Sequence, residues 1–178
     1  SVIIPTRNER GNIESAIRRA PDMGAGTDIV FVDGWSTDGT QEEIRRCIAC
    51  TRCIDEASEP KVFPYTPTCS INPVIGNELR WEKEYRPAEK SKRVVVVGGG
   101  IAGCEAARVA AMRGHKVTLL DRGKRLGGQL LIAVNVPGRD DFEDQVYFEE
   151  NEMERMGVEV RLQATADLAA IKALAPDA

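Results

Sequence analysis

The sequence predicts an α/β protein whose main feature is one strand–turn–helix unit. Four consecutive valines at 94–97 run directly into a cluster of glycines, and a helical pattern follows. An unbroken run of β-branched residues is typical of a strand that is buried on both faces of a parallel sheet. A shorter alternation of strands and helices opens the chain, and a content of 42% hydrophobic and 29% charged residues is typical of a globular protein.

The first 46 residues are expected to fold as strand, helix, strand and helix. Residues 2–4 and 28–32 are short apolar runs that predict buried strands. Residues 12–19 have the spacing of a helix. The sequence Thr-Gln-Glu-Glu at 40–43 forms a capping box, which predicts the start of a second, charged helix.

Residues 43–91 predict a cysteine-rich linker with little regular structure. They hold four of the five cysteines and five of the nine prolines, and their hydrophobic pattern has no clear period. Such a segment needs something other than a hydrophobic core to order it. The cysteines supply a candidate, because three follow a C-x2-C-x2-C spacing and fifteen residues separate them from a fourth: Cys47, Cys50, Cys53 and Cys69.

These four cysteines are candidate metal ligands. Close spacing lets three thiolates converge on one small object while the chain turns around it, and a distant fourth thiolate closes the cage. Cysteines crowded in this way are more typical of metal binding in a reducing compartment than of a disulfide framework. By chemistry alone, a tetrahedral Zn²⁺ and an iron–sulfur cluster both fit the spacing.

From residue 92 onward the hydrophobic pattern becomes regular and alternates strands with helices. Gly114 stands where a helix should stop, because glycine readily takes the left-handed conformation that ends helices. The expected elements are a strand at 94–97, a helix at 100–113, a strand at 116–120, a helix at 141–156 and a strand at 158–162.

The turn between the valine strand and its helix is a candidate phosphate-binding loop. Its sequence, Gly-Gly-Gly-Ile-Ala-Gly at 98–103, matches G-x-G-x-x-G. Gly98 permits the tight turn, Gly100 lets the backbone approach a pyrophosphate, and Gly103 lets the helix lie close to the strand. The helix N-terminus then offers free N–H donors and a partial positive charge to the phosphates. The residues expected to contact an adenine dinucleotide are therefore Gly98, Gly100, Ala102 and Gly103.

Asp121 is the candidate ribose ligand of the same unit. It lies eighteen residues after Gly103, at the end of the next predicted strand. A carboxylate at this position can accept hydrogen bonds from both hydroxyls of an adenosine ribose. It would also repel a 2′-phosphate, so this residue argues against NADP at the site.

Other features of the sequence exclude several classes of function. The net charge of −4 gives no basic footprint for nucleic acid or for an anionic membrane. The longest stretch of apolar residues and glycine, 94–104, is too short to span a bilayer. His115 is the only histidine and is expected in a solvated turn, whereas Cys104 is expected in the core, so no catalytic residue is assigned. We expect a soluble cytoplasmic protein.

Residues from about 43 to 178 resemble the C-terminal half of the iron–sulfur flavoproteins related to old yellow enzyme. This family includes 2,4-dienoyl-CoA reductase, trimethylamine dehydrogenase and the NADH:flavin oxidoreductases. The segments that carry the resemblance are 47–53, 69–73, 93–100 and 125–130. The resemblance implies a Rossmann-like fold that binds FAD, or bare ADP, with further contacts from Gly127, Gly128 and Gln129. It also implies a 4Fe–4S cluster on the four cysteines, with zinc as the weaker alternative.

In that family the cluster passes single electrons between the FAD and an FMN, which sits in an N-terminal barrel where the substrate reacts. No barrel precedes the cysteines in this sequence. We therefore expect a segment that needs an FMN-containing barrel, as a domain or a subunit, to complete turnover. The commoner family spacing is C-x2-C-x3-C with eleven or twelve residues before the last cysteine, and the departure from it leaves the fourth ligand open.

Residues 1–42 resemble the start of the inverting glycosyltransferases of family 2, such as the dolichyl-phosphate mannose synthases. The matching segments are 2–9 and 29–40. The resemblance implies a nucleotide-sugar pocket lined by Pro5, Thr6, Glu9 and Asp33. The D-x-D pair that would hold a metal and a sugar diphosphate is missing, because no two aspartates stand two residues apart. Transferase activity is therefore not expected.

The predicted organisation is a partial glycosyltransferase-like α/β segment at 1–42, a cysteine-rich iron–sulfur linker at 43–91 and a partial FAD/NAD-binding parallel sheet at 92–178. The expected function is electron transfer in an NAD(P)H-linked flavin and iron–sulfur oxidoreductase. Two alternatives stay open: a glycosyltransferase remnant that binds a nucleotide sugar, and a non-catalytic module that binds ADP or zinc. Unpaired edges on both partial sheets predict a partner or a homo-oligomer.

Overall fold

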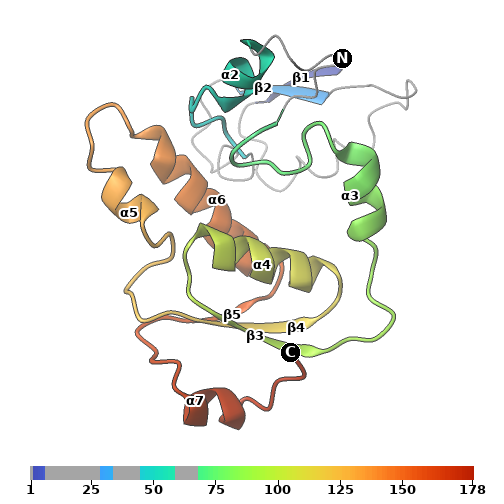
Figure 1. The fold of residues 1–178 in the computed structure, drawn as a ribbon, viewed down its shortest axis with the longest axis vertical. Coiled ribbons are helices and arrows are strands. Elements are labelled where there is room, and N and C mark those ends of the chain that lie inside the picture. The colour runs from blue at the N-terminus through green and yellow to red at the C-terminus, as the bar shows by residue number, and fades with distance from the viewer. Residues whose placement is uncertain (1, 7–28, 34–44, 59–67) are drawn as a thin grey trace. The chain divides into compact units, whose positions relative to one another are not determined.

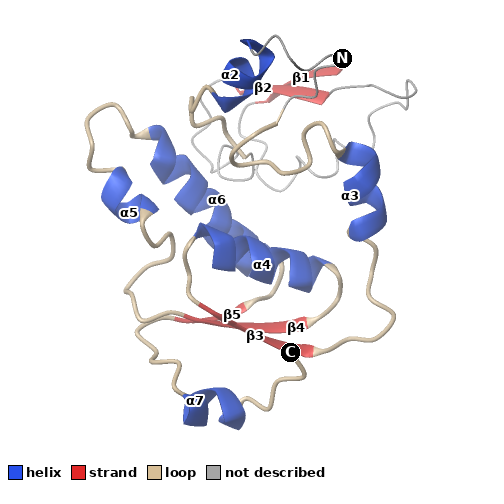
Figure 2. Ribbon diagram, in the orientation of Figure 1, coloured by secondary structure: helices blue, strands red, loops and turns tan. Residues whose placement is uncertain are grey.

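The computed structural model describes residues 2–6, 29–33, 45–58 and 68–178. The chain divides into two compact units, Ser1–Arg46 and Cys47–Ala178. The elements described in the first unit are a pair of parallel strands, and the second unit holds the remaining elements (Figures 1 and 2).

The two strands of the first unit are β1, Val2–Thr6, and β2, Ile29–Asp33. β1 runs two residues beyond the predicted strand and includes Pro5. The fixed φ of proline is compatible with an extended strand, and the residue removes only one N–H donor from the ladder. The helices predicted at 12–19 and 40–43 lie outside the described residues.

Two short helices stand in the segment where little regular structure was expected. α2 spans Arg52–Ser58 and α3 spans Glu78–Glu84. α3 buries none of its residues, so its sequence carries no apolar stripe from which a helix could be predicted. The helix is anchored by Trp81, whose indole N–H donates to the Pro73 carbonyl at 2.6 Å.

The later part of the second unit has the predicted alternation of strands and helices. β3 (Arg93–Val97), β4 (Lys116–Leu120) and β5 (Glu159–Arg161) form a three-stranded parallel sheet in that order. α4 (Ile101–Met112) connects β3 to β4, and α6 (Asp141–Arg155) leads into β5. The α/β prediction is confirmed here, and the element bounds agree to within one residue at each end.

Two further helices in this unit were not predicted from the sequence. α5 spans Leu130–Ala133 and α7 spans Leu168–Ala173, and both are too short to show a helical period. Asp167 caps α7, because its carboxylate accepts a hydrogen bond from the N–H of Ala170 at 2.7 Å.

The core of the second unit lies between the sheet and the helices α4 and α6. α4 packs over β3 and β4, α6 packs against α4, and α7 lies on the opposite side of the sheet (Figure 1). Cys104 is fully buried, which confirms that this thiol belongs to the core. The buried cluster consists of Cys104, Ala107, Val117, Leu119, Leu126, Met153 and Val158.

His115 differs from the expected solvated turn residue. It is half-buried, and its Nδ1 accepts a hydrogen bond from the N–H of Lys92 at 3.2 Å. The neighbouring Ser91 hydroxyl donates to the Gly114 carbonyl at 2.7 Å. The histidine therefore helps to hold the start of β3 against the turn before β4.

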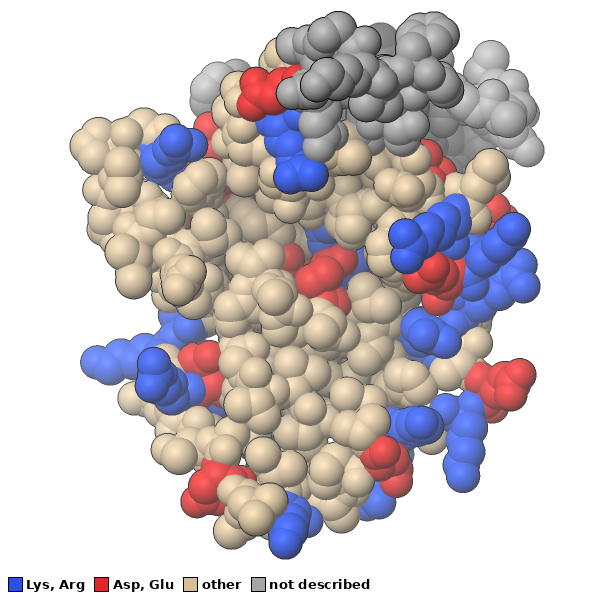
Figure 3. Space-filling model, viewed as in Figure 1, with Lys and Arg blue, Asp and Glu red and all other residues tan. Residues whose placement is uncertain are grey.

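None of the helices that the structure describes combines the length and the hydrophobicity that a bilayer span requires. Figure 3 shows Lys and Arg side chains interspersed with Asp and Glu on the visible face of the described residues.

Candidate functional site

The glycine-rich turn between β3 and α4 is tightly packed against itself. Gly98 has φ +104°, a conformation that side-chain-bearing residues rarely adopt, and its N–H donates to the Leu120 carbonyl at 2.8 Å. A Cβ on Gly103 would lie only 1.8 Å from the Gly98 carbonyl oxygen. The first and last glycines of the motif are therefore required by the protein's own backbone.

Gly100 differs from these two glycines. It is the N-cap of α4 and has an ordinary φ of −73°. A Cβ added to it would meet no protein atom within 4 Å, so the space in front of the helix N-terminus is open. The exposed Ala102 lies in the first turn of the same helix. An open approach to free backbone N–H groups is what a bound diphosphate requires.

Asp121 follows β4 and holds the glycine-rich turn in place. Its Oδ2 accepts a hydrogen bond from the N–H of Gly99 at 2.6 Å, and its Oδ1 accepts one from Gly123 at 2.5 Å. A carboxylate has about four acceptor positions, so each oxygen keeps capacity for a ribose hydroxyl. The contact with Gly99 could not be predicted from the sequence, because this glycine stands 22 residues before Asp121.

A second pair of glycines meets the first turn. The N–H of Gly127 donates to the Gly99 carbonyl at 2.8 Å. A Cβ on Gly128 would lie 2.9 Å from the Cα of Gly100, so the two loops touch through backbone alone. Gln129 follows with an exposed side chain. The structure thus brings together the two glycine segments that the sequence analysis assigned to the cofactor.

Arg125 fastens the second glycine loop to α6, a role that the sequence analysis did not assign. Its guanidinium pairs with Glu143 and also, at 2.9 Å, with Glu150, and it lies 4.9 Å from the ring centroid of Tyr147. These partners raise the pKa of the guanidinium above its ordinary value, chiefly through hydrogen bonds to Glu150 and Glu143. Acidic residues are expected on the polar face of an amphipathic helix such as α6. The sequence therefore gave no indication that Glu143 and Glu150 share Arg125 as a partner.

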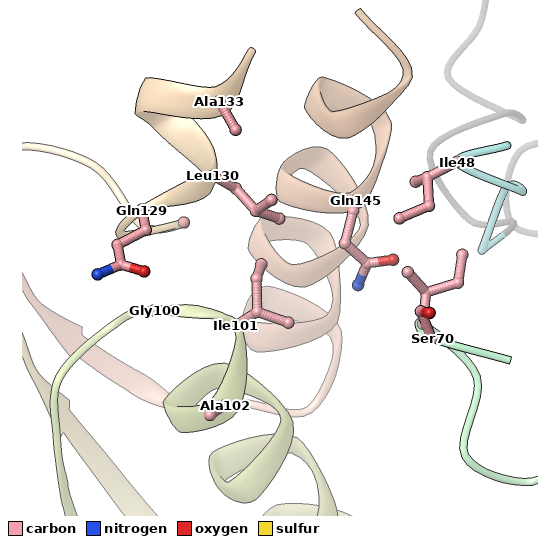
Figure 4. Close-up of a pocket in the computed structure, with 11 residues that line it drawn as sticks. Ile48, Ser70, Gly100, Ile101, Ala102, Gln129, Leu130, Ala133 and Gln145 are labelled. Carbon is pink, nitrogen blue, oxygen red and sulfur yellow. The ribbon is translucent and has the colours of Figure 1, made fainter. Parts of the chain in front are cut away.

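A cavity of about 660 Å³ opens beside both glycine loops (Figure 4). This volume is typical of small-molecule and cofactor sites. Its wall includes four of the predicted cofactor residues together with mainly apolar side chains. The lining residues are Ile48, Ser70, Ile71, Gly100, Ile101, Ala102, Gly127, Gln129, Leu130, Ala133 and Gln145. Gln145 was not predicted as a site residue, because a glutamine in a charged helix is expected on the surface.

Two of the four candidate metal ligands, Cys47 and Cys50, precede α2, Cys53 lies in its first turn, and Cys69 stands in a loop that is tied to this segment. Cys47 and Cys53 are exposed, whereas Cys50 and Cys69 are half-buried. The Cys50 thiol donates to the Ser70 hydroxyl at 3.3 Å. The Arg52 guanidinium donates to the Thr68 hydroxyl at 3.0 Å, so the loop before α2 is linked to the loop that carries the fourth cysteine.

Two thiols have shifted acidities with different causes. Hydrogen bonding with Ser70 and with backbone N–H groups lowers the pKa of the Cys50 thiol, which favours the thiolate that metals bind. Burial raises the pKa of Cys104 to about 12, so this thiol stays protonated in the core. Among the residues that the structure describes, no group of three Cys, His, Asp or Glu side chains forms a ready metal-ion site.

The predicted nucleotide-sugar residues belong to the first unit. Pro5 and Thr6 end β1 and Asp33 ends β2. Thr6 and Asp33 are register partners, so the paired strands place these two positions side by side at one edge. Glu9 lies outside the described residues.

Comparison with known families gives two matches, one in each half of the chain. The model for FAD dependent oxidoreductase matches residues 93–162. The model for glycosyl transferase family 2 gives a weak match over residues 1–62. Each match covers less than half of the chain.

Curated relatives extend over more of the chain. An NADH oxidase from Thermoanaerobacter brockii is 42% identical over 164 residues, which are 89% of this chain and 24% of that protein. A bilirubin reductase from Mediterraneibacter gnavus is 38% identical over 78% of this chain and 21% of that protein. The chain therefore spans about a quarter or less of the length of these relatives.

A solved structure has the same arrangement. A 2-naphthoyl-CoA reductase in complex with 2-naphthoyl-CoA aligns with a TM-score of 0.66 and 34% identity. The alignment covers 76% of this chain and 20% of the reductase.

Proposed function

We propose that residues 47–178 form an electron-transfer segment that binds FAD, because the homologues and structural neighbours of this chain are flavin oxidoreductases. The observation that carries the proposal is the meeting of two glycine loops at the N-terminus of α4, beside an open cavity. Bound at this site, FAD would accept an electron pair and release electrons to a second redox centre.

The roles of individual residues follow from their geometry. The N-terminal N–H groups of α4 would bind the diphosphate, with Gly100 and Gly128 leaving the space that it needs. Asp121 would bind the ribose through the acceptor positions that Gly99 and Gly123 leave free. An adenine cofactor without a 2′-phosphate fits this carboxylate, as the sequence analysis proposed.

The same proposal includes a 4Fe–4S cluster on Cys47, Cys50, Cys53 and Cys69. It is supported by the cysteine spacing and by the two hydrogen bonds that join the loops around residues 50 and 69. The lowered pKa of Cys50 also suits a thiolate ligand. NAD(P)H as the electron source and an FMN-containing barrel as the partner complete the proposal.

Gly100→Val tests the flavin site in the full chain. The protein tolerates a Cβ at this position, so the variant should fold, yet its side chain would occupy the place of the diphosphate. We expect flavin content, measured by absorbance after anaerobic purification, to fall to background. An unchanged flavin content in the folded variant would rule out this loop as the binding site.

A second candidate function concerns the first unit. The glycosyltransferase model covers it, and the strand register places Thr6 beside Asp33. Nucleoside diphosphate binding to this unit is the corresponding proposal. Calorimetric titration with UDP and GDP tests it: binding that Asp33→Ala abolishes would support it, and no binding to the parent chain would exclude it.

A further inference from the structure

Gln145 on α6 is a buried amide in the wall of the cavity beside the glycine loops. Its side chain is among the least accessible in the second unit, since the residue is 2% exposed. Figure 4 shows it projecting from α6 toward Ile48 and Ser70, with the oxygen on that side. Within the described residues, its Oε1 has no hydrogen-bond partner.

The orientation of this amide is held by its neighbour one turn along the helix. The Nε2 of Gln145 donates to Glu149 Oε1 at 2.6 Å. Rotating the amide by half a turn would break this hydrogen bond, because the amide oxygen would then face Glu149 Oε1 in place of the N–H donor. The Oε1 atom is therefore kept as the group that faces the cavity.

An unmet buried acceptor costs stability, because it has lost its water and gained nothing in return. Most of the neighbouring lining side chains are apolar, and the two other polar ones, Ser70 and Gln129, make no hydrogen bond with this oxygen. A ligand that enters the cavity with an N–H group would satisfy the oxygen. Apolar walls with one acceptor suit a flat heterocycle that carries one such donor.

We propose that Gln145 positions the isoalloxazine ring of the flavin by accepting a hydrogen bond from its N3–H. This inference rests on the proposed FAD site and adds the place and contact of the ring. The cavity is continuous with that site, because Gly100, Ala102, Gly127 and Gln129 line it as well. The adenosine diphosphate half of the cofactor makes no use of Gln145.

The test compares three ligands on the full chain: FAD, 3-methyl-FAD, which lacks the N3–H, and ADP, which lacks the ring. We expect Gln145→Met to bind FAD about tenfold more weakly than the parent chain does and to bind ADP equally well. The parent should bind 3-methyl-FAD about tenfold more weakly than FAD, and the variant should no longer distinguish the two flavins. Flavin fluorescence and calorimetry measure these affinities.

Gln163→Met is the matched control, since Gln163 is exposed and does not line the cavity. Equal FAD affinity in Gln145→Met and the parent would overturn the inference, as would an equal loss of ADP and FAD affinity. If Gln145→Met does not fold, equal binding of FAD and 3-methyl-FAD to the parent chain overturns it. A parent chain that binds neither FAD nor ADP would instead overturn the proposed function.

Discussion

The glycine-rich turn and the cysteine loops differ in what holds them in shape. The turn at 98–103 is fixed by contacts with the protein's own backbone and with Asp121. The cysteine loops are joined by two side-chain hydrogen bonds, and Ala49 and Thr51 adopt positive φ values of 48° and 61°. Such values are unfavourable for residues with a Cβ, and most of all for a β-branched one.

This difference indicates that the shapes of the two proposed cofactor sites depend on their ligands to different degrees. The flavin site is preformed, because removing any ligand would leave the turn and its packing intact. The cysteine site needs an occupant to draw its thiols together and to offset the cost of the strained loop. The following experiments test this contrast, starting with the largest expected effect.

Gly103→Ala should destabilise the glycine turn most severely. The added Cβ would lie 1.8 Å from the Gly98 carbonyl oxygen, so α4 must move away from β3. We expect the free energy of unfolding, from urea denaturation without cofactor, to fall by about 3 kcal/mol or more. Gly100→Ala is the control and should lose nothing, because its Cβ meets no protein atom within 4 Å. Equal stability of the two variants would contradict a self-supporting turn.

Cys50→Ser should abolish the proposed cluster while leaving the flavin site folded. Serine replaces the thiolate ligand with a weakly binding hydroxyl. We expect iron per chain, measured after anaerobic purification, to drop to near zero, with the affinity for ADP unchanged. Cys104→Ala removes a thiol from the core and should keep its iron. Full iron content in Cys50→Ser would remove this cysteine from the ligand set.

Alkaline pH should weaken the second unit through Cys104. Its pKa is 9.0 when unperturbed and about 12 in the core, so above about pH 9 the unfolded chain releases a proton that the folded chain retains. Stability should therefore fall by about 1.4 kcal/mol per pH unit between these two values. Urea denaturation at several pH values checks this. In Cys104→Ala, stability should fall less steeply with pH, because the variant lacks this thiol. An identical dependence of stability on pH in the variant and the parent would refute the role of Cys104.

Arg125→Met should have the smallest effect. The methionine keeps much of the apolar stem but removes the pairing with Glu143 and Glu150. The side chain is 34% exposed, so solvent screening limits the expected loss of stability to about 1 kcal/mol. Arg80→Met, which breaks an exposed pair with Glu84, should cause no measurable change in urea denaturation. If Arg80→Met lowered stability more than Arg125→Met does, α3 would contribute more to the stability of the protein than the exposure of its residues indicates.

The sequence by itself determined the alternation of elements from residue 93 onward, because the four valines, the glycines and the helical spacing act over short distances. It also marked Gly98, Gly100 and Gly103, whose different roles the packing then separated. It could not predict α2, α3, α5 or α7, since these helices are short or expose most of their residues and leave little hydrophobic pattern.

Only the tertiary structure decided which residues meet around the cavity. Three contacts join positions that lie many residues apart. They are the hydrogen bond between Asp121 and Gly99, the close approach of Gly128 to Gly100, and the pairing of Arg125 with α6. The same is true of Gln145, which reads as a surface residue in a charged helix and is buried because α6 packs beside α4 and α5. Local patterns encode elements, whereas a shared site depends on where the chain brings those elements together.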